Sequence, residues 1–183
     1  MHTLRRLGVF VFAASLACAG KSTPELPVDA LYEPPAPIPI RVGLKSDNSL
    51  PSQLYGGAVI RDLKQMRLFE DLISPYNAHA QMDAKLKLFI ERAETDQLDE
   101  FVLGLVDAGK PIRGAFAKPD PILTTRIPVG PDVGSGVLGT LKASNPSSVR
   151  AHARRLSNAL AKKIYEDREA LLEHLKREEA PPN

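Results

Sequence analysis

The chain contains a single cysteine, Cys18, among 183 residues, so no disulfide can form within it. A domain without disulfides has to be stabilised by a packed apolar core. Apolar residues make up 43% of the chain, and its length suits one domain of about 100–150 residues. These limits favour a single globular unit that carries its own hydrophobic core.

The N-terminal segment has the pattern of an export signal. Arg5 and Arg6 precede an apolar run from Leu7 to Ala17. A charged start, a short apolar run and small residues before a cleavage point are typical of a signal peptide, whereas a membrane-spanning helix needs about 20 apolar residues. We therefore expect residues 1–17 to be a signal peptide, followed by a chain without a spanning helix.

The end of this signal resembles the lipobox of bacterial lipoproteins. The residues are Ala14-Ser-Leu-Ala-Cys18, with serine where the family prefers leucine. In that family the signal is cut before the cysteine, which then carries diacylglycerol and an N-acyl chain such as palmitate. The resemblance implies that Cys18 is lipidated and anchors the chain to a membrane, since two or more acyl chains give stable anchoring. Ordinary secretion with cleavage after Ala19 is the alternative.

In bacterial lipoproteins, the residue after the lipidated cysteine influences which membrane the protein reaches. Ala19 is not the aspartate that signals retention at the inner membrane in enteric lipoproteins. The resemblance therefore implies a cell-envelope protein at the outer membrane, facing the periplasm.

Charge argues against nucleic acid as a partner. The chain has 24 basic and 22 acidic residues, and Arg5 and Arg6 of the signal account for the excess. The mature chain is therefore neutral, while phosphate binding needs clustered positive charge. Tryptophan is absent as well, which disfavours a stacking surface for bases or sugars.

Prolines set residues 18–37 apart from the rest of the chain. Six prolines lie between Lys21 and Pro39, a density that blocks helices and favours extended polyproline-II segments. We expect a lipidated tether over 18–37, extended at about 3.1 Å per residue, and one domain over 38–183. The alternative to a spacer is a disordered leader.

Hydrophobic periodicity predicts the elements of the domain. Alternation of apolar and polar residues indicates half-buried strands, and apolar spacings of three and four indicate helices. We expect strands at 40–44, 69–73, 83–91, 124–129 and 137–141, and helices at 51–68, 96–108 and 146–178. This order is typical of an α/β (α+β) fold: one small mixed sheet with helices packed on it and a long C-terminal helix.

Local signals refine the helices. Ser49 is expected to cap the first helix with Pro51 in its first turn, although Gly56 and Gly57 weaken its first half. Gly109 is expected to end the second helix. The third would be about 50 Å long, more than a small domain needs, so its apolar stripe is either core or a seam for a partner helix. On it, Lys162–Glu166, Lys163–Asp167 and Glu173–Arg177 are expected as i,i+4 ion pairs.

Two glycine-rich strings invite comparison with catalytic motifs. Gly134, Gly136 and Gly139 match G-x-G-x-x-G, but a dinucleotide site needs a helix that opens at the glycines, and none is predicted there. Ser135 lies in G-S-G rather than in the G-x-S-x-G of a nucleophile elbow. We expect a glycine-rich turn of a hairpin, with neither a cofactor nor a nucleophile.

Histidines and carboxylates do not form a recognisable site in the sequence. His79, His152 and His174 lack the spacing of metal ligands, so no metal is expected. The carboxylates that could be paired for acid–base work are Asp96, Asp99, Glu100, Glu166 and Asp167. Helix faces in solvent produce such pairs routinely, and acid–base catalysis needs a partly buried cleft. We therefore expect no enzyme.

The mature chain is also similar to small α/β periplasmic lipoproteins. Examples are curli-secretion-type and penicillin-binding-protein-activator-type lipoproteins and the auxiliary lipoproteins of envelope transporters. The shared pattern is a strand at 40–44, a helix ending in a short strand at 67–72, and a strand at 84–90. The resemblance implies a non-catalytic accessory protein that binds another envelope protein. The alternative is a carrier of a small or lipidic ligand between helices and sheet.

Overall fold

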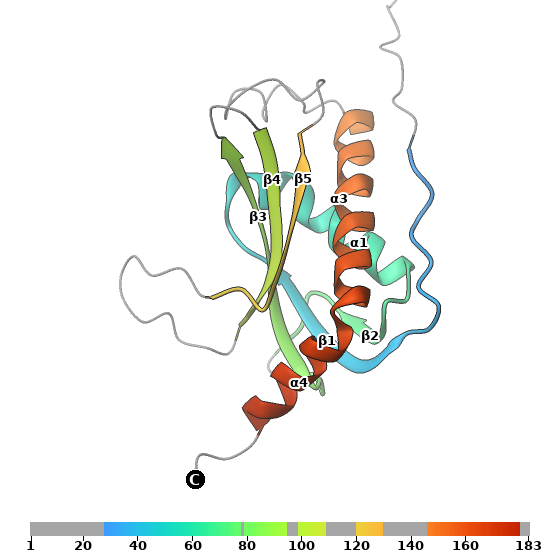
Figure 1. Ribbon diagram of the computed structural model, residues 1–183, viewed down its shortest axis with the longest axis vertical. Coiled ribbons are helices and arrows are strands. Elements are labelled where there is room, and N and C mark those ends of the chain that lie inside the picture. The colour runs from blue at the N-terminus through green and yellow to red at the C-terminus, as the bar shows by residue number, and fades with distance from the viewer. Residues whose placement is uncertain (1–27, 78, 95–98, 109–119, 130–145, 180–183) are drawn as a thin grey trace, which may run out of the picture.

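The computed structural model describes residues 28–77, 79–94, 99–108, 120–129 and 146–179. The strands are β1 (Ile38–Ser46), β2 (Phe69–Ile73), β3 (Ala84–Glu94), β4 (Asp99–Asp107) and β5 (Leu123–Pro128). The helical segments are the π-helical turn η1 (Ser52–Gly56), α1 (Gly57–Gln65), α3 (Pro146–Glu166) and α4 (Arg168–Glu179). One mixed sheet with helices packed on it confirms the predicted α+β class (Figure 1).

The sheet has the strand order β2-β1-β3-β4-β5. β1 is parallel to both β2 and β3, with Val42 opposite Leu72 on one side and Ala84 on the other. β3, β4 and β5 pair antiparallel in sequence order. The strands predicted at 40–44, 69–73, 83–91 and 124–129 are confirmed, whereas 137–141 and the hairpin turn lie outside the described residues.

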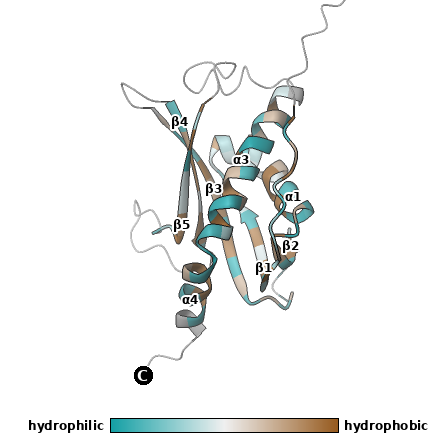
Figure 2. Ribbon diagram, turned by 45° about the vertical axis from the view of Figure 1, so that its right-hand side comes forward, coloured by the Kyte–Doolittle hydropathy of each residue, from teal (hydrophilic) through white to brown (hydrophobic). Residues whose placement is uncertain are grey.

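Alternate residues of β3 are buried and define the face of the sheet on which the core lies. Leu86, Leu88 and Ile90 are fully buried, and the antiparallel register places Leu88 opposite Leu105 and Ile90 opposite Leu103. Directly opposed residues share a face, so these side chains form one apolar layer. α1 and α3 cover this layer, and Figure 2 shows their apolar sides turned toward the sheet.

The helix predicted at 96–108 is wrong, because Asp99–Asp107 is the strand β4. Phe101, Val102 and Leu105 fit a helical spacing, but Phe101, Leu103 and Leu105 also alternate along one face. Residues 101–106 carry no polar side chain, so periodicity alone could not decide between helix and strand. Antiparallel pairing with β3 on one side and with β5 on the other selects the strand.

Two serines attach the start of the first helical segment to the sheet. Ser49 Oγ accepts a hydrogen bond from the Ser52 N–H at 3.4 Å, which confirms the predicted cap, and donates one to the Ile90 carbonyl at 2.8 Å. The buried Ser52 Oγ accepts from the Ile90 N–H at 2.8 Å. The weakness predicted at Gly56 and Gly57 coincides with the change from the π-helical turn to α1.

The long helix predicted from Pro146 to Glu178 is two helices. α3 ends at Glu166, and α4 starts at Arg168 and turns away from the sheet (Figure 1). The guanidinium of Arg168 donates to the Tyr165 carbonyl at 2.9 Å. A side chain that occupies a helix carbonyl is a common cause of a sharp bend. The prediction of a single helix about 50 Å long is therefore wrong.

The apolar stripe of α3 belongs to the core. Ala153, Leu156, Leu160 and Ile164 are each at most 2% exposed. On α4, Leu171 is also buried, while Leu172 and Leu175 are half-buried against the core. The core interpretation of this stripe is thus confirmed for α3 and for the first turn of α4.

Candidate functional site

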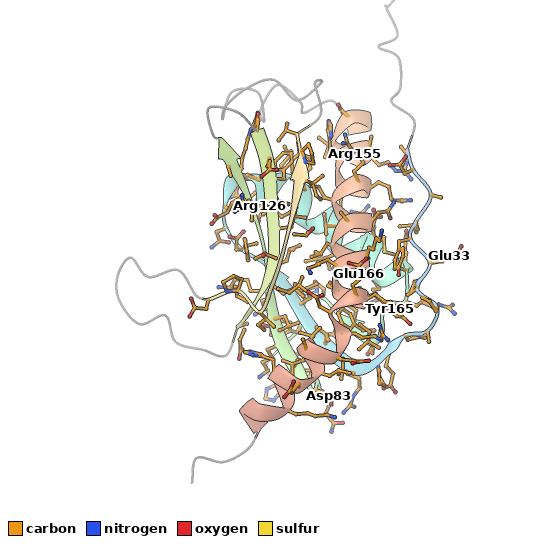
Figure 3. All side chains as sticks on the ribbon, viewed as in Figure 1. Glu33, Asp83, Arg126, Arg155, Tyr165 and Glu166 are labelled. Atoms are coloured by element: carbon orange, nitrogen blue, oxygen red, sulfur yellow. The ribbon has the colours of Figure 1, made fainter. Side chains whose placement is uncertain are left out.

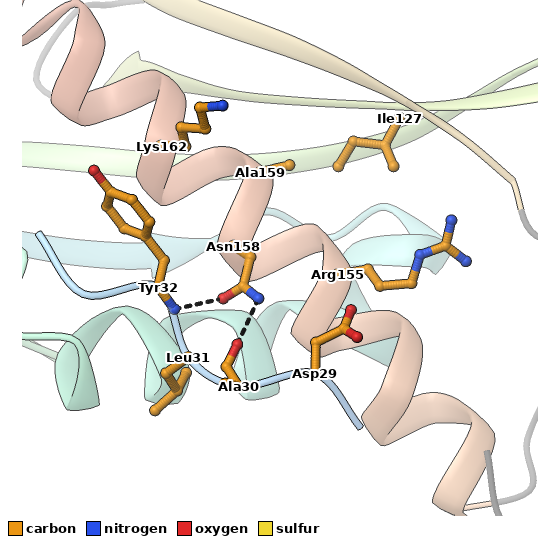
Figure 4. Close-up of a pocket in the computed structure, with 9 residues that line it drawn as sticks. All are labelled: Asp29, Ala30, Leu31, Tyr32, Ile127, Arg155, Asn158, Ala159 and Lys162. Atoms are coloured by element: carbon orange, nitrogen blue, oxygen red, sulfur yellow. Dashed lines mark hydrogen bonds between the residues drawn. The ribbon is translucent and has the colours of Figure 1, made fainter. Parts of the chain in front are cut away.

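A groove lies between α3, the edge strand β5 and residues 29–32, which precede the sheet (Figure 4). Its volume is about 400 Å³. Ile127 of β5 and Ala159 of α3 contribute apolar surface, as does Leu31 of the segment 29–32. The other lining residues are Asp29, Ala30, Tyr32, Arg155, Asn158 and Lys162. Ligand sites in proteins typically begin at about 300 Å³ and combine apolar walls with a few polar groups.

One wall of the groove is a segment held by the side chain of Asn158. The Asn158 carboxamide accepts from the Tyr32 N–H at 2.9 Å and donates to the Ala30 carbonyl at 2.8 Å. This side chain thus pairs with both polar groups of an extended backbone, as a neighbouring strand would. Arg154 adds a hydrogen bond to the Asp29 carbonyl at 3.1 Å. Residues 29–32, in the second half of the expected tether, therefore contact the domain.

Behind the segment, Arg154 also belongs to a buried polar network. Its guanidinium donates two hydrogen bonds to the Asp62 carboxylate of α1, at 2.8 and 3.3 Å. The Ser157 hydroxyl, fully buried, donates to the same carboxylate at 3.1 Å. Asp62 is 8% exposed, and a buried carboxylate requires such partners. The network connects α1, α3 and the segment 29–32.

Two cations stand at the solvent side of the groove. Arg155 and Lys162 are exposed and lie seven residues apart on α3, a separation of about 10 Å along the helix. Figure 3 shows Arg155 nearer the N-terminal end of α3 than Glu166, which is the last residue of that helix. Lys162 has Glu166 at 4.0 Å, and Asp29 adds a carboxylate to the lining. The groove can thus accept an apolar group that carries an acidic or zwitterionic end.

The carboxylates that the sequence singled out are in ion pairs. Asp99 receives a bidentate contact from Arg92 within the β3–β4 pair. Glu100 has Arg126 of β5 at 3.4 Å. The predicted pairs Lys162–Glu166, at 4.0 Å, and Lys163–Asp167, at 2.8 Å, are confirmed. The structure does not bring the described carboxylates together into one cleft. Asp96 and the side chain of Arg177 lie outside what it describes.

The three histidines lie on different elements of the fold. His152 of α3 is 4% exposed and meets the Tyr55 ring edge-on at 6.4 Å between centroids. His174 is half-buried on α4, and His79 is exposed in the loop after β2. Within the described ranges, no three histidine, cysteine or acidic residues are grouped as metal ligands would be.

Groups with shifted pKa values lie outside the groove. On the other side of the sheet, hydrogen bonds from Arg41 lower the pKa of Asp83 below its ordinary value, and Asp83 raises the pKa of Arg41. Burial raises the pKa of Tyr76, with a contribution from Asp107. The Asp167 partner raises the pKa of Lys163. Each shift has a structural pairing or burial as its cause.

Several predictions concern residues outside the described ranges. Cys18, Ser135 and the glycines at 134, 136 and 139 all belong to this set, as does the predicted helix stop at Gly109. Among the helices that are described, none is both long enough and apolar enough to cross a membrane.

Sequence reasoning missed Arg154 and Asn158. One signal was present in α1, where Asp62 interrupts the apolar positions Val59, Leu63 and Met66. An acid within an apolar stripe needs a buried partner, and Arg154 is the cation that supplies it. For Asn158 the sequence contains no comparable signal, because its hydrogen-bond partners are backbone groups.

Known proteins show little similarity to this chain. No family model matches the chain. No curated protein matches its sequence either. Among solved structures, the chain is similar to the crystal structure of protein XCC0632 from Xanthomonas campestris, of the family DUF330. The TM-score is 0.43 at 10% identity, over 79% of this chain and 96% of that one.

Proposed function

We propose that the chain is a lipid-anchored accessory protein of the bacterial envelope whose domain binds another envelope protein and has no catalytic role. The observation that carries this proposal is the lipobox-like segment Ala14–Cys18, placed after a basic start and a short apolar run. This segment lies upstream of the described residues, which begin at residue 28.

The anchor is tested by mutation of the cysteine. With Cys18→Ala, we expect the protein to leave the membrane fraction and to lose the added mass of diacylglycerol and an acyl chain. The matched control is Ser15→Ala, which changes the signal without removing the thiol. Retention of Cys18→Ala at the membrane with unchanged mass would contradict lipidation.

The groove is the surface that we assign to the partner. Charged side chains flank an apolar floor there, and protein interfaces commonly surround an apolar centre with a polar rim. We expect the double variant Arg155→Glu/Lys162→Glu to lose a partner that is crosslinked to the wild-type protein in membranes. Arg61→Glu/Lys64→Glu is the control, since it reverses the same two residue types at exposed positions of α1. Loss of the partner in the control alone would place the interface on α1.

A second candidate function is binding of a small or lipidic ligand in the same groove. The observation that favours it is the combination of apolar lining, two cations and a volume of about 400 Å³. Extraction of the purified protein and mass spectrometry distinguish the two. A stoichiometric amphiphile that is lost in Arg155→Glu/Lys162→Glu, without any crosslinked protein, would favour the ligand over the partner.

A further inference from the structure

The hydrogen bonds of α3 fix the direction in which the N-terminal segment runs. Arg154 contacts Asp29, and Asn158, one turn further along α3, contacts Ala30 and Tyr32. The segment therefore runs parallel to α3. Asp29 therefore lies nearer the N-terminal end of α3 than Tyr32 does, and we call that end of the helix the anchor end (Figures 1 and 4).

The first strand starts at the opposite end of the molecule. From Tyr32 the chain follows α3 downward in Figure 1 and enters β1 at Ile38, at the end where α4 lies. Release of residues 29–37 would move the point of attachment from the anchor end to the α4 end. It would also lengthen the tether by nine residues, about 28 Å in extended form.

Chain length limits how the domain can turn at the membrane. Asp29 is eleven residues after Cys18, a length that reaches at most about 40 Å and would span about 17–20 Å on average as a flexible chain. Lys176 of α4 lies 22 residues beyond Arg154, about 33 Å along the helices. To bring α4 to the lipid surface, the tether would have to extend almost fully back along the domain.

We propose that Asn158 and Arg154 form a clamp that orients the domain at the membrane, with the anchor end toward the lipid surface and α4 away from it. This inference rests on the proposed lipidation of Cys18. The clamp acts through backbone hydrogen bonds to residues 29–32, so it depends on the conformation of the segment. The groove then lies beside the middle of α3, between the lipid surface and α4, and α4 faces the periplasm.

Fluorescence quenching in liposomes tests the orientation. Because lipidation consumes the sole native cysteine, a single new cysteine at Arg150→Cys or Lys176→Cys can be labelled unambiguously. Both positions are exposed on helices, one near each end. With the lipidated protein in vesicles that carry a headgroup quencher, we expect at least twofold stronger quenching at position 150 than at position 176.

Two variants open the clamp from different sides. Asn158→Ala removes the carboxamide from α3, and Tyr32→Pro removes the N–H from the segment while α3 stays intact. We expect each to abolish the twofold difference between the two probes. Gln65→Ala is the control, because it removes an exposed carboxamide that makes no hydrogen bond to a described residue.

The outcomes separate orientation from anchoring. Equal quenching at positions 150 and 176 in the protein with an intact clamp would contradict the proposed orientation. So would a difference between the two probes that persists in both Asn158→Ala and Tyr32→Pro. Neither result would contradict lipidation of Cys18. A chain that carries no lipid by mass spectrometry would overturn the anchor and, with it, the orientation.

Discussion

On the face of the sheet that α1 and α3 cover, Leu88, Leu103 and Leu105 are at most 1% exposed, whereas the opposite face carries Arg41 and Lys85 in contact with solvent. Both faces use an arginine–aspartate pair. Arg154–Asp62 joins α3 to α1, with side chains about one eighth exposed, while Arg41–Asp83 is 44% and 40% exposed. Breaking the buried pair should therefore change the free energy of unfolding much more than breaking the exposed pair, because desolvation and solvent screening differ between the two sites.

The largest effect is expected in the apolar layer of the covered face. Leu88→Ala should lower the free energy of unfolding by about 3–4 kcal/mol, because it leaves a cavity among fully buried neighbours. Leu50→Ala, at a leucine that is 38% exposed, should cost below about 1 kcal/mol. Urea denaturation of both variants measures the difference. Equal losses would mean that the covered face does not dominate stability.

The buried ion pair comes next. Asp62→Ala should cost about 3 kcal/mol, because it leaves the Arg154 guanidinium without its carboxylate in a mostly buried position. The double variant Asp62→Leu/Arg154→Met should recover part of this loss, since it removes both charges. Chemical denaturation of the single and double variants is the measurement. A double variant less stable than Asp62→Ala would contradict the desolvation argument.

On the opposite face, Gly104 tests whether packing is tight there as well. A Cβ at this position would lie 2.3 Å from the Leu123 carbonyl oxygen and 2.6 Å from the Phe89 ring, so Gly104→Ala should cost about 2 kcal/mol. Gly57→Ala is the matched control: no atom lies within 4 Å, and its backbone is helical, so a gain of about 0.5–1 kcal/mol is expected. Thermal denaturation of both variants compares the two sites. If Gly104→Ala has the stability of the wild type, β5 shifts to make room for the methyl group at little cost.

The smallest effect is expected at the solvent-exposed pair. Asp83→Asn should reduce stability slightly at neutral pH and low salt. Arg41 lowers the folded-state pKa of Asp83 below its ordinary value of 3.8, so the pair's contribution is present above that value and is lost as the pH falls through the folded pKa. The difference between wild type and Asp83→Asn should therefore shrink on acidification and in high salt. A difference that persists at low pH would require another role for Asp83.

Local patterns predicted much of this fold because they depend on neighbours in sequence. The alternation of Leu86, Leu88 and Ile90 predicts β3 and its buried face, and Ser49 with Pro51 predicts the start of the first helical segment. In both cases the residues that decide are within a few positions of one another. The i,i+4 pairs on α3 are predictable for the same reason.

Predictions failed where distant residues decide. β4 satisfies both helical and strand spacings, and only its pairing with β3 and β5 selects the strand. The bend between α3 and α4 depends on how Arg168 reaches the Tyr165 carbonyl, which composition does not indicate. The groove likewise unites residues from positions 29 to 162, so no local window contains it.

The sequence by itself determined the class of fold, the positions of most strands and the single candidate anchor at Cys18, because these depend on composition, spacing and local motifs. Only the tertiary structure decided that residues 29–32 lie on α3 and that Arg154, Asp62 and Ser157 form one network. The physical reason is that a polar group acquires its role from the partners that surround it after folding. For Asn158 those partners are backbone groups more than 120 residues away, to which no side-chain pattern points.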